Sequence, residues 1–281
     1  MSAAILDGKE LAKKLLAQIS AQVSSRSSTS KKLGLATVLV GDDAASKSYV
    51  AGKHRDCAEV GISSIKVESD KNASKSQLLD QISKLNSDTN CTGFLVQLPL
   101  PNSFAVTEIL AKISPEKDVD GLTPENLGLL ALGKPRVIPC TARAIQYLLQ
   151  HYRIDIAGRQ VLIIGRGMTV GRPLSILLSS KENNATVTLA HSASKDLPQL
   201  IAKNDVVITA VGKPNWLKSD WVKSDATVID VGITKLADKL VGDCDEKVVQ
   251  NCKFYAPVPG GVGPLTRAML LQNLLDLDAA E

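Results

Sequence analysis

The sequence has few aromatic residues, no long apolar run and no clustered charge of one sign. Phe, Trp and Tyr make up 3% of its 281 residues, and a net charge of +4 arises from basic residues that alternate with acids. Nucleic-acid binding needs clustered cations and rings that stack on bases, so we expect no such partner. An apolar run of about 18 residues and a signal-peptide pattern are both absent, so we expect neither membrane insertion nor secretion, and a cytoplasmic location.

Cysteine and histidine are also scarce. The sequence contains 5 Cys and 3 His, which show neither CxxC pairs nor the spacing of a zinc site. We therefore expect thiols in a reducing compartment and no metal site. The cysteines are Cys57, Cys91, Cys140, Cys244 and Cys252.

The composition, 44% hydrophobic and 22% charged, is that of a globular protein with room for two domains. Helix and strand patterns alternate, which predicts an α/β fold: two α/β domains flanking a cleft, the second a Rossmann-type doubly wound parallel sheet. We expect a first domain at 1–138, onto which a helix at 265–281 packs back, and a second at 139–264, with a proline-marked hinge at 134–141. Apolar residues at 1–15 are assigned to the first helix. Helices are expected at 8–23, 46–60, 75–85 and 264–277, a serine-rich loop at 24–30, and strands at 33–40, 62–67, 93–98, 161–164, 185–189, 205–211 and 227–231.

The most informative segment is VLIIGRGMTVGRP at residues 161–173. A buried-strand pattern leads into a turn with Gly165, Gly167 and Gly171, and a helix follows, which is the context in which a helix N-terminus binds a dinucleotide. The glycine spacing is one residue longer than the usual fingerprint, so a turn that uses glycine only for packing is the alternative. The strand patterns downstream favour dinucleotide binding.

The residues after the second strand of this half indicate which dinucleotide. NAD-binding domains usually place Asp or Glu there for the ribose 2′-hydroxyl, whereas this sequence has His191 and Ser192. Arg166 in the glycine turn can pair with a phosphate. These residues predict NADP, unless Arg166 and His191 are simply solvated.

Four further features could carry chemistry. Tyr49 and Lys53 share one face of a predicted helix and can reach one ligand, although a surface pair is the alternative. Gln97 ends a buried strand in GFLVQLPLP, where α/β sheets bind ligands. The segment KDVDG at 117–121 puts two carboxylates on a turn, and PVPGGVGP at 257–264 specifies one backbone path; each of these two is also compatible with a purely structural turn.

Together with the motifs YxxxK, PEKDVDG, IPCT and VGRP, these features resemble the bifunctional methylenetetrahydrofolate dehydrogenase/methenyltetrahydrofolate cyclohydrolase family, called FolD in bacteria, over about residues 6–275. The resemblance, and not the composition, implies folate as the substrate. It implies NADP-dependent oxidation of 5,10-methylenetetrahydrofolate and hydrolysis of the product to 10-formyltetrahydrofolate, in one active site between the domains. It also implies a homodimer that serves one-carbon metabolism and purine biosynthesis.

The resemblance assigns roles to individual residues. Lys53 would be the central catalytic residue, Tyr49 would position the folate, Gln97 would hold Lys53, and Asp120 would bind the pterin ring. Folate contacts are expected at Tyr49, Val96, Gln97, Leu98, Asp120, Pro259, Gly260, Gly261, Val262, Gly263 and Pro264. NADP contacts are expected at Thr141, Gly165, Arg166, Gly167, Val170, Gly171, His191, Ser192 and Ile233.

Three positions depart from the family pattern. Gly167 stands where many members have Ser, Ala142 where Pro is common, and Leu129 where Arg is frequent; the first removes a hydroxyl that would contact phosphate. Two other functions fit part of the pattern. One is an NAD-linked dehydrogenase without cyclohydrolase activity, which the missing acid after the second strand opposes. The other is a dinucleotide-sensing regulatory protein, which the intact set of catalytic residue types opposes.

Overall fold

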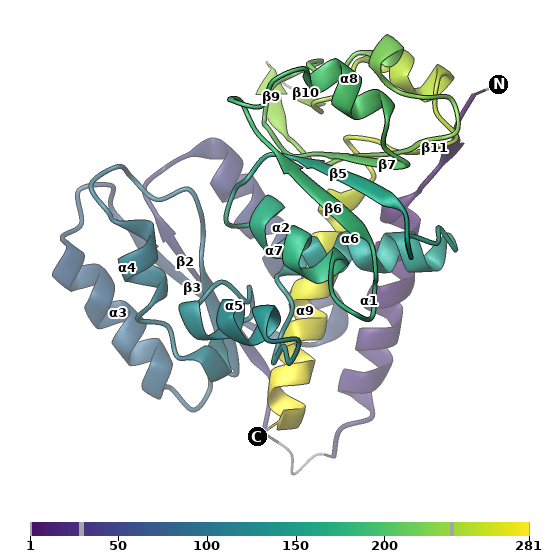
Figure 1. Ribbon diagram of the computed structural model, residues 1–281. Coiled ribbons are helices and arrows are strands. Elements are labelled where there is room, and N and C mark those ends of the chain that lie inside the picture. The colour runs from purple at the N-terminus through teal and green to yellow at the C-terminus, as the bar shows by residue number, and fades with distance from the viewer. Residues whose placement is uncertain (1, 28–30, 237–238, 281) are drawn as a thin grey trace. The chain divides into compact units, whose positions relative to one another are not determined.

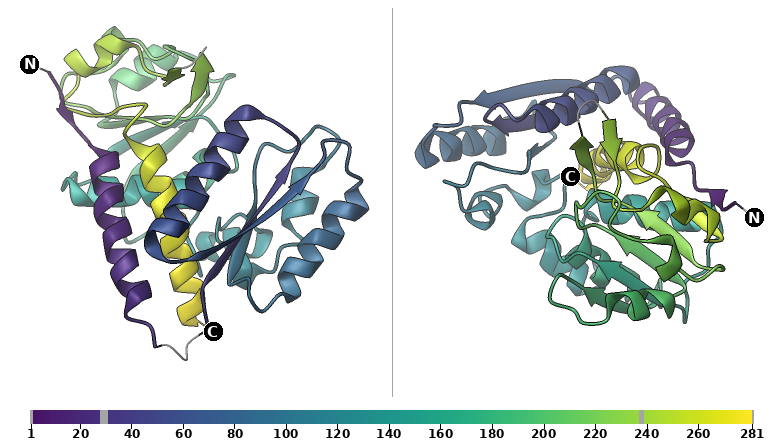
Figure 2. Two further views of the ribbon diagram at one scale, coloured as in Figure 1. Left: turned by 180° about the vertical axis from the view of Figure 1, so that it is seen from behind. Right: turned by 90° about the horizontal axis from the view of Figure 1, so that it is seen from above.

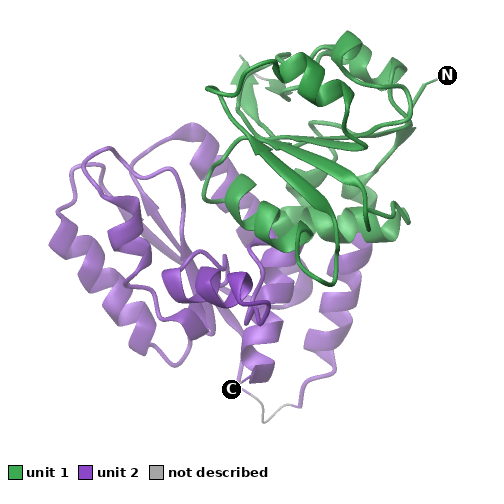
Figure 3. Cartoon of the chain, in the orientation of Figure 1, with its two compact units in different colours: residues 1–12, 141–266 green, residues 13–140, 267–281 purple. Residues whose placement is uncertain are grey.

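The computed structural model describes residues 2–27, 31–236 and 239–280. The chain divides into two compact units (Figure 3). Unit 1 comprises Met1–Ala12 and Thr141–Thr266, and unit 2 comprises Lys13–Cys140 and Arg267–Glu281. Part of the serine-rich loop predicted at 24–30, namely 28–30, lies outside the described residues.

Unit 1 is built on a six-stranded sheet with the order β1-β11-β8-β7-β5-β6, in which all neighbouring strands are parallel. Its central strands, such as VLII in β5 and VVIT in β7, are buried apolar runs, as is typical of a parallel sheet covered on both faces. The chain places β6 on one side of β5 and β7 on the other, so the strand order reverses beside β5, as in doubly wound folds. The strands are β1 (Ala4–Ile5), β5 (Gln160–Ile164), β6 (Thr186–Ala190), β7 (Val206–Thr209), β8 (Thr227–Asp230) and β11 (Phe254–Ala256).

Helices and a hairpin complete unit 1 (Figure 1). Helix α7 packs against β5 and β6. The sequence has 2 tryptophans, Trp216 and Trp221, and both pack against the apolar core of the sheet. Their rings meet edge to face, with centroids 5.5 Å apart. The remaining elements of this part of the chain are α6 (Cys140–His151), α7 (Gly171–Leu178), α8 (Leu197–Ala202), the hairpin β9 (Thr234–Leu236) and β10 (Lys239–Val241), and the 3-10 helices Ser219–Trp221 and Glu246–Gln250.

The N-terminal residues depart from the sequence prediction. They were assigned to the first helix and to the first domain, but Ala4–Ile5 forms a strand in the sheet of unit 1, where β1 pairs in parallel with β11. The backbone N–H of Leu6 donates to the carbonyl of Tyr255 at 2.8 Å and extends this pairing. A strand of two residues is too short to show an alternating pattern, so the prediction of helix for these residues was wrong.

Unit 2 contains a three-stranded parallel sheet with the order β3-β2-β4. The central strand β2, GLATVLV, is buried along its whole length, whereas the edge strand β3 is exposed at every second position. Helix α2 packs on β2 and β3. It begins after Asp43, whose carboxylate accepts the N–H of Ser46, and ends before Gly61, whose φ of 80° favours glycine. The elements are β2 (Gly34–Val40), β3 (Ser63–Ser69), β4 (Gly93–Val96), α2 (Ala44–Val60), α3 (Lys75–Ser87), α4 (Val106–Leu110), α5 (Pro124–Ala131) and the 3-10 helix Pro115–Lys117.

Two long helices, α1 (Gly8–Ser24) and α9 (Val262–Ala280), supply the rest of the unit 2 core. Their unit 2 portions run side by side in both ribbon views (Figures 1 and 2), and Arg26, just beyond α1, forms an ion pair with Asp278 at 2.5 Å. Side chains of both helices, such as Ile19 and Leu274, are buried and belong to the core of unit 2. The α/β class and the doubly wound parallel sheet in the second half are confirmed.

Three observations concern the predictions from composition. None of the described helices combines the length and the apolar character needed to cross a bilayer. Within the described ranges, no group of three or more His, Cys, Asp or Glu side chains is arranged to hold a metal ion. All the cysteines are buried thiols, and desolvation raises the pKa of Cys57 and Cys252 to about 12 and that of Cys91 to about 11, so these thiols are unreactive.

Candidate functional site

Tyr49 and Lys53 lie one turn apart on α2 and approach one another, as their spacing predicts. Lys53 Nζ lies over the Tyr49 ring, 5.1 Å from its centroid. Lys53 is only 5% exposed. The alternative that Tyr49 and Lys53 form a solvent-exposed pair on the protein surface is therefore excluded.

Gln97 follows β4 directly and contacts this lysine. Lys53 Nζ donates to Gln97 Oε1 at 3.1 Å, and Gln97 Nε2 donates to the carbonyl of Leu98 at 2.7 Å. The second hydrogen bond fixes the amide so that its oxygen faces the lysine. The backbone N–H of Gln97 donates to the carbonyl of Val38 in β2 at 2.8 Å. This bond fixes the Gln97 backbone at the end of the sheet.

Burial dominates the electrostatics of these groups. Desolvation lowers the pKa of Lys53 from its usual 10.5; Asp120 opposes the shift and Arg267 adds to it. Desolvation also raises the pKa of Tyr49, and Asp120 raises it further. The lysine is therefore biased toward the neutral amine, which is the form that accepts a proton.

Asp120 is carried by a turn that the neighbouring acid, Asp118, organises. Asp118 is 1% exposed and accepts hydrogen bonds from the N–H groups of Gly121 at 2.9 Å and Thr123 at 2.7 Å, and from Asn126 Nδ2 at 3.0 Å. Asp120 is half-buried and lies close enough to Lys53 to raise its pKa. The two acids of the turn thus differ in their surroundings: Asp118 is buried and holds the turn, whereas Asp120, to which the family resemblance gives the pterin role, is half-buried.

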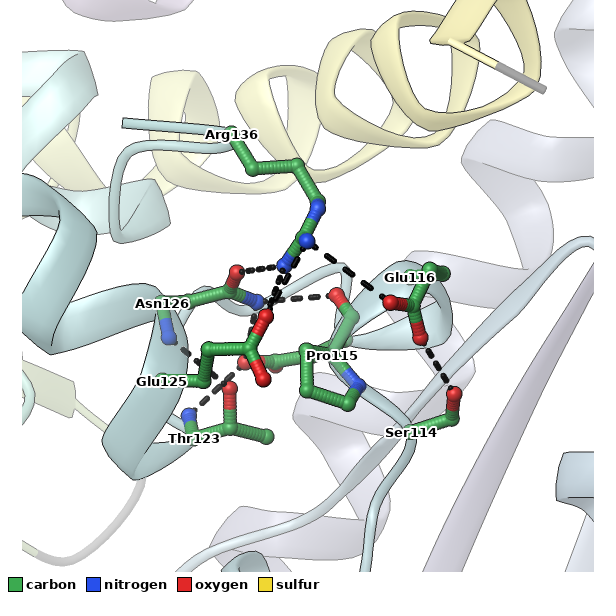
Figure 4. A network of polar contacts seen from close by, with 8 residues as sticks. Ser114, Pro115, Glu116, Thr123, Glu125, Asn126 and Arg136 are labelled. Carbon is green, nitrogen blue, oxygen red and sulfur yellow. Dashed lines mark hydrogen bonds and ion pairs between the residues drawn. The ribbon is translucent and has the colours of Figure 1, made fainter. Parts of the chain in front are cut away.

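A second set of contacts supports the same turn (Figure 4). Arg136 Nη1 donates to Asn126 Oδ1 at 2.9 Å and to Glu125 Oε1 at 3.1 Å, and Arg136 Nη2 lies 3.6 Å from Glu116 Oε1. Asn126 Nδ2 also donates to the carbonyl of Pro115 at 3.0 Å. The two glutamates are exposed, so each ion pair adds little stability. The network mainly fixes the backbone path before α5.

Two side chains of α9 reach this region without having been singled out in the sequence. Buried Asn273 donates from Nδ2 to the carbonyl of Val119 at 2.8 Å, and Arg267 Nε donates to Asp56 Oδ2 at 2.7 Å, one turn after Lys53 on α2. These contacts join residues separated by 154 and 211 positions. No local pattern signals a pairing over such distances.

In unit 1 the glycine turn connects β5 to α7. Gly165 has φ +116°, and a Cβ on it would lie 2.2 Å from the Ala210 carbonyl oxygen; a Cβ on Gly171 would lie 1.7 Å from the Gly165 carbonyl oxygen. A Cβ on Gly167 would meet nothing within 4 Å. Packing, the alternative considered for this glycine turn, therefore accounts for two of its glycines: Gly165 and Gly171 allow the backbone to pack on itself, whereas Gly167 borders open space.

The other predicted NADP contacts lie mostly in loops at one edge of the sheet. Because the strands are parallel, the loops after β5, β6 and β8 gather at the carboxyl edge, where doubly wound folds bind dinucleotides. The loop after β6 is ordered by its own contacts, since His191 donates its N–H to Ser194 Oγ at 3.0 Å and accepts the Ala193 N–H at Nδ1, 3.2 Å away. Arg166 and Val170 lie in the glycine turn, His191 and Ser192 follow β6, Ile233 follows β8, and Thr141 lies in the first turn of α6.

The segment at 257–264 links β11 to α9 and has a tightly fixed backbone. The Lys9 N–H donates to the Gly260 carbonyl at 2.8 Å, and the Gly261 N–H donates to the Pro257 carbonyl at 2.8 Å. A Cβ on Gly8 would lie 1.9 Å from the Gly261 carbonyl oxygen, so α1 closes directly on this segment. Of the predicted folate contacts, Val96 lies in β4, Leu98 after it, Pro259, Gly260 and Gly261 in this segment, and Val262, Gly263 and Pro264 in the first turn of α9.

Family models match both parts of the chain. Residues 6–120 match the tetrahydrofolate dehydrogenase/cyclohydrolase catalytic domain. Residues 139–281 match the tetrahydrofolate dehydrogenase/cyclohydrolase NAD(P)-binding domain. The two matches follow one another along the chain in the order that the motifs indicate.

Solved structures are similar over the full length. The bifunctional FolD methylenetetrahydrofolate dehydrogenase/cyclohydrolase from Campylobacter jejuni is 40% identical, with a TM-score of 0.94 and 100% of both chains covered. The FolD enzyme from Trypanosoma brucei, complexed with NADP and an inhibitor, is 35% identical, with a TM-score of 0.95 and coverage of 100% of this chain and 98% of that one. The bifunctional enzyme from Thermoplasma acidophilum is 33% identical, with a TM-score of 0.90 and coverage of 99% and 98%. The chain therefore belongs to the tetrahydrofolate dehydrogenase/cyclohydrolase family, as its motifs predicted.

Proposed function

We propose that the protein oxidises 5,10-methylenetetrahydrofolate to 5,10-methenyltetrahydrofolate with NADP and hydrolyses this product to 10-formyltetrahydrofolate, one bound folate serving both steps. The observation that carries the proposal is the buried amine of Lys53, 3.1 Å from Gln97 Oε1 and over the Tyr49 ring. Membership of the family supports both reactions. The T. brucei relative, which was solved with NADP, supports the cofactor.

The oxidation depends on positioning more than on proton transfer. NADP, when bound, supplies the acceptor for the hydride that leaves the one-carbon bridge. Tyr49 stacks on or positions the folate, and the Asp120 carboxylate accepts paired hydrogen bonds from the amino and ring N–H groups of the pterin. The hydrogen bonds of Asp118 fix the turn that presents Asp120. These contacts serve to keep the two reacting carbons close together.

The hydrolysis requires a base and then an acid. Water attacks the cationic methenyl carbon, and the neutral amine of Lys53 accepts the proton that the water loses. The resulting ammonium returns that proton to the ring nitrogen as the carbon–nitrogen bond breaks, and the hydroxyl on the former methenyl carbon releases its own proton to solvent as the formyl C=O forms. Desolvation, which lowers the pKa of Lys53, favours the neutral amine, and Gln97 Oε1 holds the group in place.

The loops of unit 1 fit the phosphates of a dinucleotide. Gly167 borders open space, the neighbouring Arg166 is exposed and cationic, and the loop after β6 has His191 and Ser192 in place of an acid. An acid at that point would repel a 2′-phosphate, so this arrangement supports NADP. Steady-state kinetics with both cofactors test the choice, and a clear preference for NAD would refute it.

A spectrophotometric assay tests the reaction itself. Methenyltetrahydrofolate is followed as it forms from 5,10-methylenetetrahydrofolate and NADP, and then as it decays with enzyme present. Formation followed by enzyme-dependent decay is the expected result. Formation alone would indicate a dehydrogenase without cyclohydrolase activity, and NADP binding without formation would indicate a regulatory protein.

Gly167→Ser is expected to tighten NADP binding by about three- to tenfold, because a hydroxyl in the open space beside the glycine turn adds one hydrogen bond to a phosphate. Isothermal titration calorimetry with NADP measures the change. Gly128→Ser is the matched control, since a Cβ on Gly128 also meets nothing within 4 Å but lies in unit 2. Equal NADP affinity in Gly167→Ser and the parent protein would show that the hydroxyl reaches no phosphate.

Asp120→Ala is expected to weaken folate binding by about tenfold or more, the usual loss for hydrogen bonds to a charged group. The affinity for NADP is expected to stay the same, and so is the fold, because Asp118 and not Asp120 holds the turn. Calorimetry with tetrahydrofolate and with NADP separates the two affinities. Asp80→Ala, which removes an exposed acid from α3, controls for the change in net charge. Unchanged folate affinity would contradict the pterin role of Asp120.

We also propose that the protein is a homodimer in the cytoplasm and provides one-carbon units for purine biosynthesis. Its membership of the family supports this proposal. Analytical ultracentrifugation across a concentration range tests the assembly state. A monomer at all concentrations would refute the dimer.

A further inference from the structure

Two buried carboxylates at the carboxyl edge of the unit 1 sheet take no part in the chemistry above. Asp230, the last residue of β8, is 1% exposed, and Asp243, which follows β10, is 0% exposed. Burial of a carboxylate is costly, and desolvation raises the pKa of both, that of Asp230 to about 6. Hydrogen bonds from backbone N–H groups to both carboxylates offset this cost.

Asp230 binds the segment that follows the hairpin. Its Oδ1 accepts the N–H of Asp243 at 2.9 Å and the hydroxyl of Thr209 at 3.3 Å, and its Oδ2 accepts the N–H of Cys244 at 2.9 Å. Thr209 ends β7, so the carboxylate links the ends of β7 and β8 to the returning chain.

Asp243 continues this link to the loop after β7. Its Oδ2 accepts the N–H of Val211 at 2.8 Å, and its Oδ1 accepts the N–H of Lys213 at 2.8 Å. The hydroxyl of Thr234, the first residue of β9, donates to the Gly212 carbonyl of the same loop at 3.2 Å. The side chain of Asp243 thus fixes the loop at 211–213, and Asp230 in turn holds the backbone N–H of Asp243.

Glycines opposite each carboxylate make this packing possible. A Cβ on Gly232 would lie 2.1 Å from Asp243 Oδ2, and a Cβ on Gly242 would lie 2.0 Å from Asp230 Oδ2. The Asp243 carboxylate therefore packs against Gly232, two residues after Asp230, and the Asp230 carboxylate packs against Gly242, the residue before Asp243. We call Asp230, Gly232, Gly242 and Asp243 the carboxylate clasp.

We propose that the carboxylate clasp is a positioning device for the NADP site, which holds the loop at 211–213 and the residue Ile233 in their binding conformation before NADP arrives. The inference rests on the proposed function, because it requires that NADP binds at this edge. Ile233 follows Gly232 directly, and the loop at 211–213 follows β7 at the point where doubly wound sheets bind dinucleotides. Neither aspartate has to touch the cofactor. A loop fixed in advance spares NADP the entropy of ordering it.

Asp243→Asn tests the clasp. The amide keeps one acceptor but turns an NH2 group toward one of the two N–H groups, so one hydrogen bond is lost and two donors face one another. Calorimetry is expected to show NADP binding that is about 10- to 100-fold weaker, the loss that follows from one hydrogen bond to a charged group. Binding of tetrahydrofolate is expected to be unchanged.

Asp205→Asn is the matched control. Asp205 also accepts a backbone hydrogen bond, from Gln160 at 2.9 Å, but it lies just before β7, at the opposite edge of the same sheet. This variant is expected to bind NADP as the parent protein does. Equal weakening in the two variants would show a general loss of stability and would overturn the specific role of the clasp.

Hydrogen exchange on the parent protein tests the clasp without any substitution. The amides of Val211 and Lys213 are expected to be protected in the absence of NADP, because Asp243 already holds them. Protection that appears only after NADP binds would overturn the proposal, even if Asp243→Asn does not fold. Failure of the parent protein to bind NADP would refute the proposed function, whereas parent-like binding in Asp243→Asn would refute the clasp alone.

Discussion

Lys53→Met is expected to lower the cyclohydrolase rate by roughly 10²- to 10⁴-fold, the usual contribution of a general acid–base group. Methionine keeps an unbranched chain in the buried position and removes the amine that is proposed to accept the proton of the attacking water. The dehydrogenase rate is expected to be less affected than the cyclohydrolase rate, since hydride transfer depends mainly on the position of the two reacting carbons. The decay of methenyltetrahydrofolate measures the first rate, and NADPH formation measures the second.

Lys47→Met provides the control for this result, because Lys47 is an exposed lysine on the same helix. Both activities are expected to be retained in it. In the parent enzyme the cyclohydrolase rate is expected to rise with pH through an inflection below 10.5, since desolvation lowers the pKa of Lys53 and only the neutral amine is a base. Hydrolysis at the parental rate by Lys53→Met would remove Lys53 from the mechanism.

Gly171→Ala is expected to reduce the free energy of unfolding by about 3 kcal/mol and to weaken NADP binding strongly. The new Cβ would lie 1.7 Å from the Gly165 carbonyl oxygen, so either α7 or the glycine turn must move. Both lie at the carboxyl end of β5, and movement of either displaces the backbone amides to which the proposed NADP site assigns the phosphates. Urea denaturation measures the stability, and calorimetry measures the NADP affinity.

Gly167→Ala adds the same methyl group two residues after Gly165, in open space. Its stability is expected to stay within about 0.5 kcal/mol of the parent, as for most exposed substitutions. If the Ala variants at 167 and 171 unfold at the same urea concentration, the close approach to the Gly165 carbonyl is not what requires glycine at 171.

Much of the fold was accessible from the sequence because its strands are buried and parallel. Runs such as VLII before Gly165 and GLATVLV in β2 are continuous and apolar, and turn or helix signals bound them. Strand ends were less certain: the strand predicted at 93–98 ends at Val96, which leaves Gln97 just outside it. Its position at the end of the strand is what lets it reach Lys53.

The site was only partly accessible from the sequence. Tyr49 and Lys53 are close in sequence and share a helix face, so their approach could be predicted from spacing. The roles of Asp118 and Asn273 depend on hydrogen bonds to backbone groups, which have no sequence signature. The two-residue strand β1 escaped prediction because its partner strand β11 is distant in sequence, and the clasp between Asp230 and Asp243 escaped it because it depends on hydrogen bonds to backbone N–H groups.

The placement of Trp216 and Trp221 has a spectroscopic consequence. Both indoles of the sequence belong to unit 1 and touch one another, so tryptophan emission reports the melting of that unit alone. Far-ultraviolet circular dichroism follows the helices of both units. Coincident midpoints from the two signals would show that the chain unfolds as one cooperative body, and separate midpoints would give each unit its own stability.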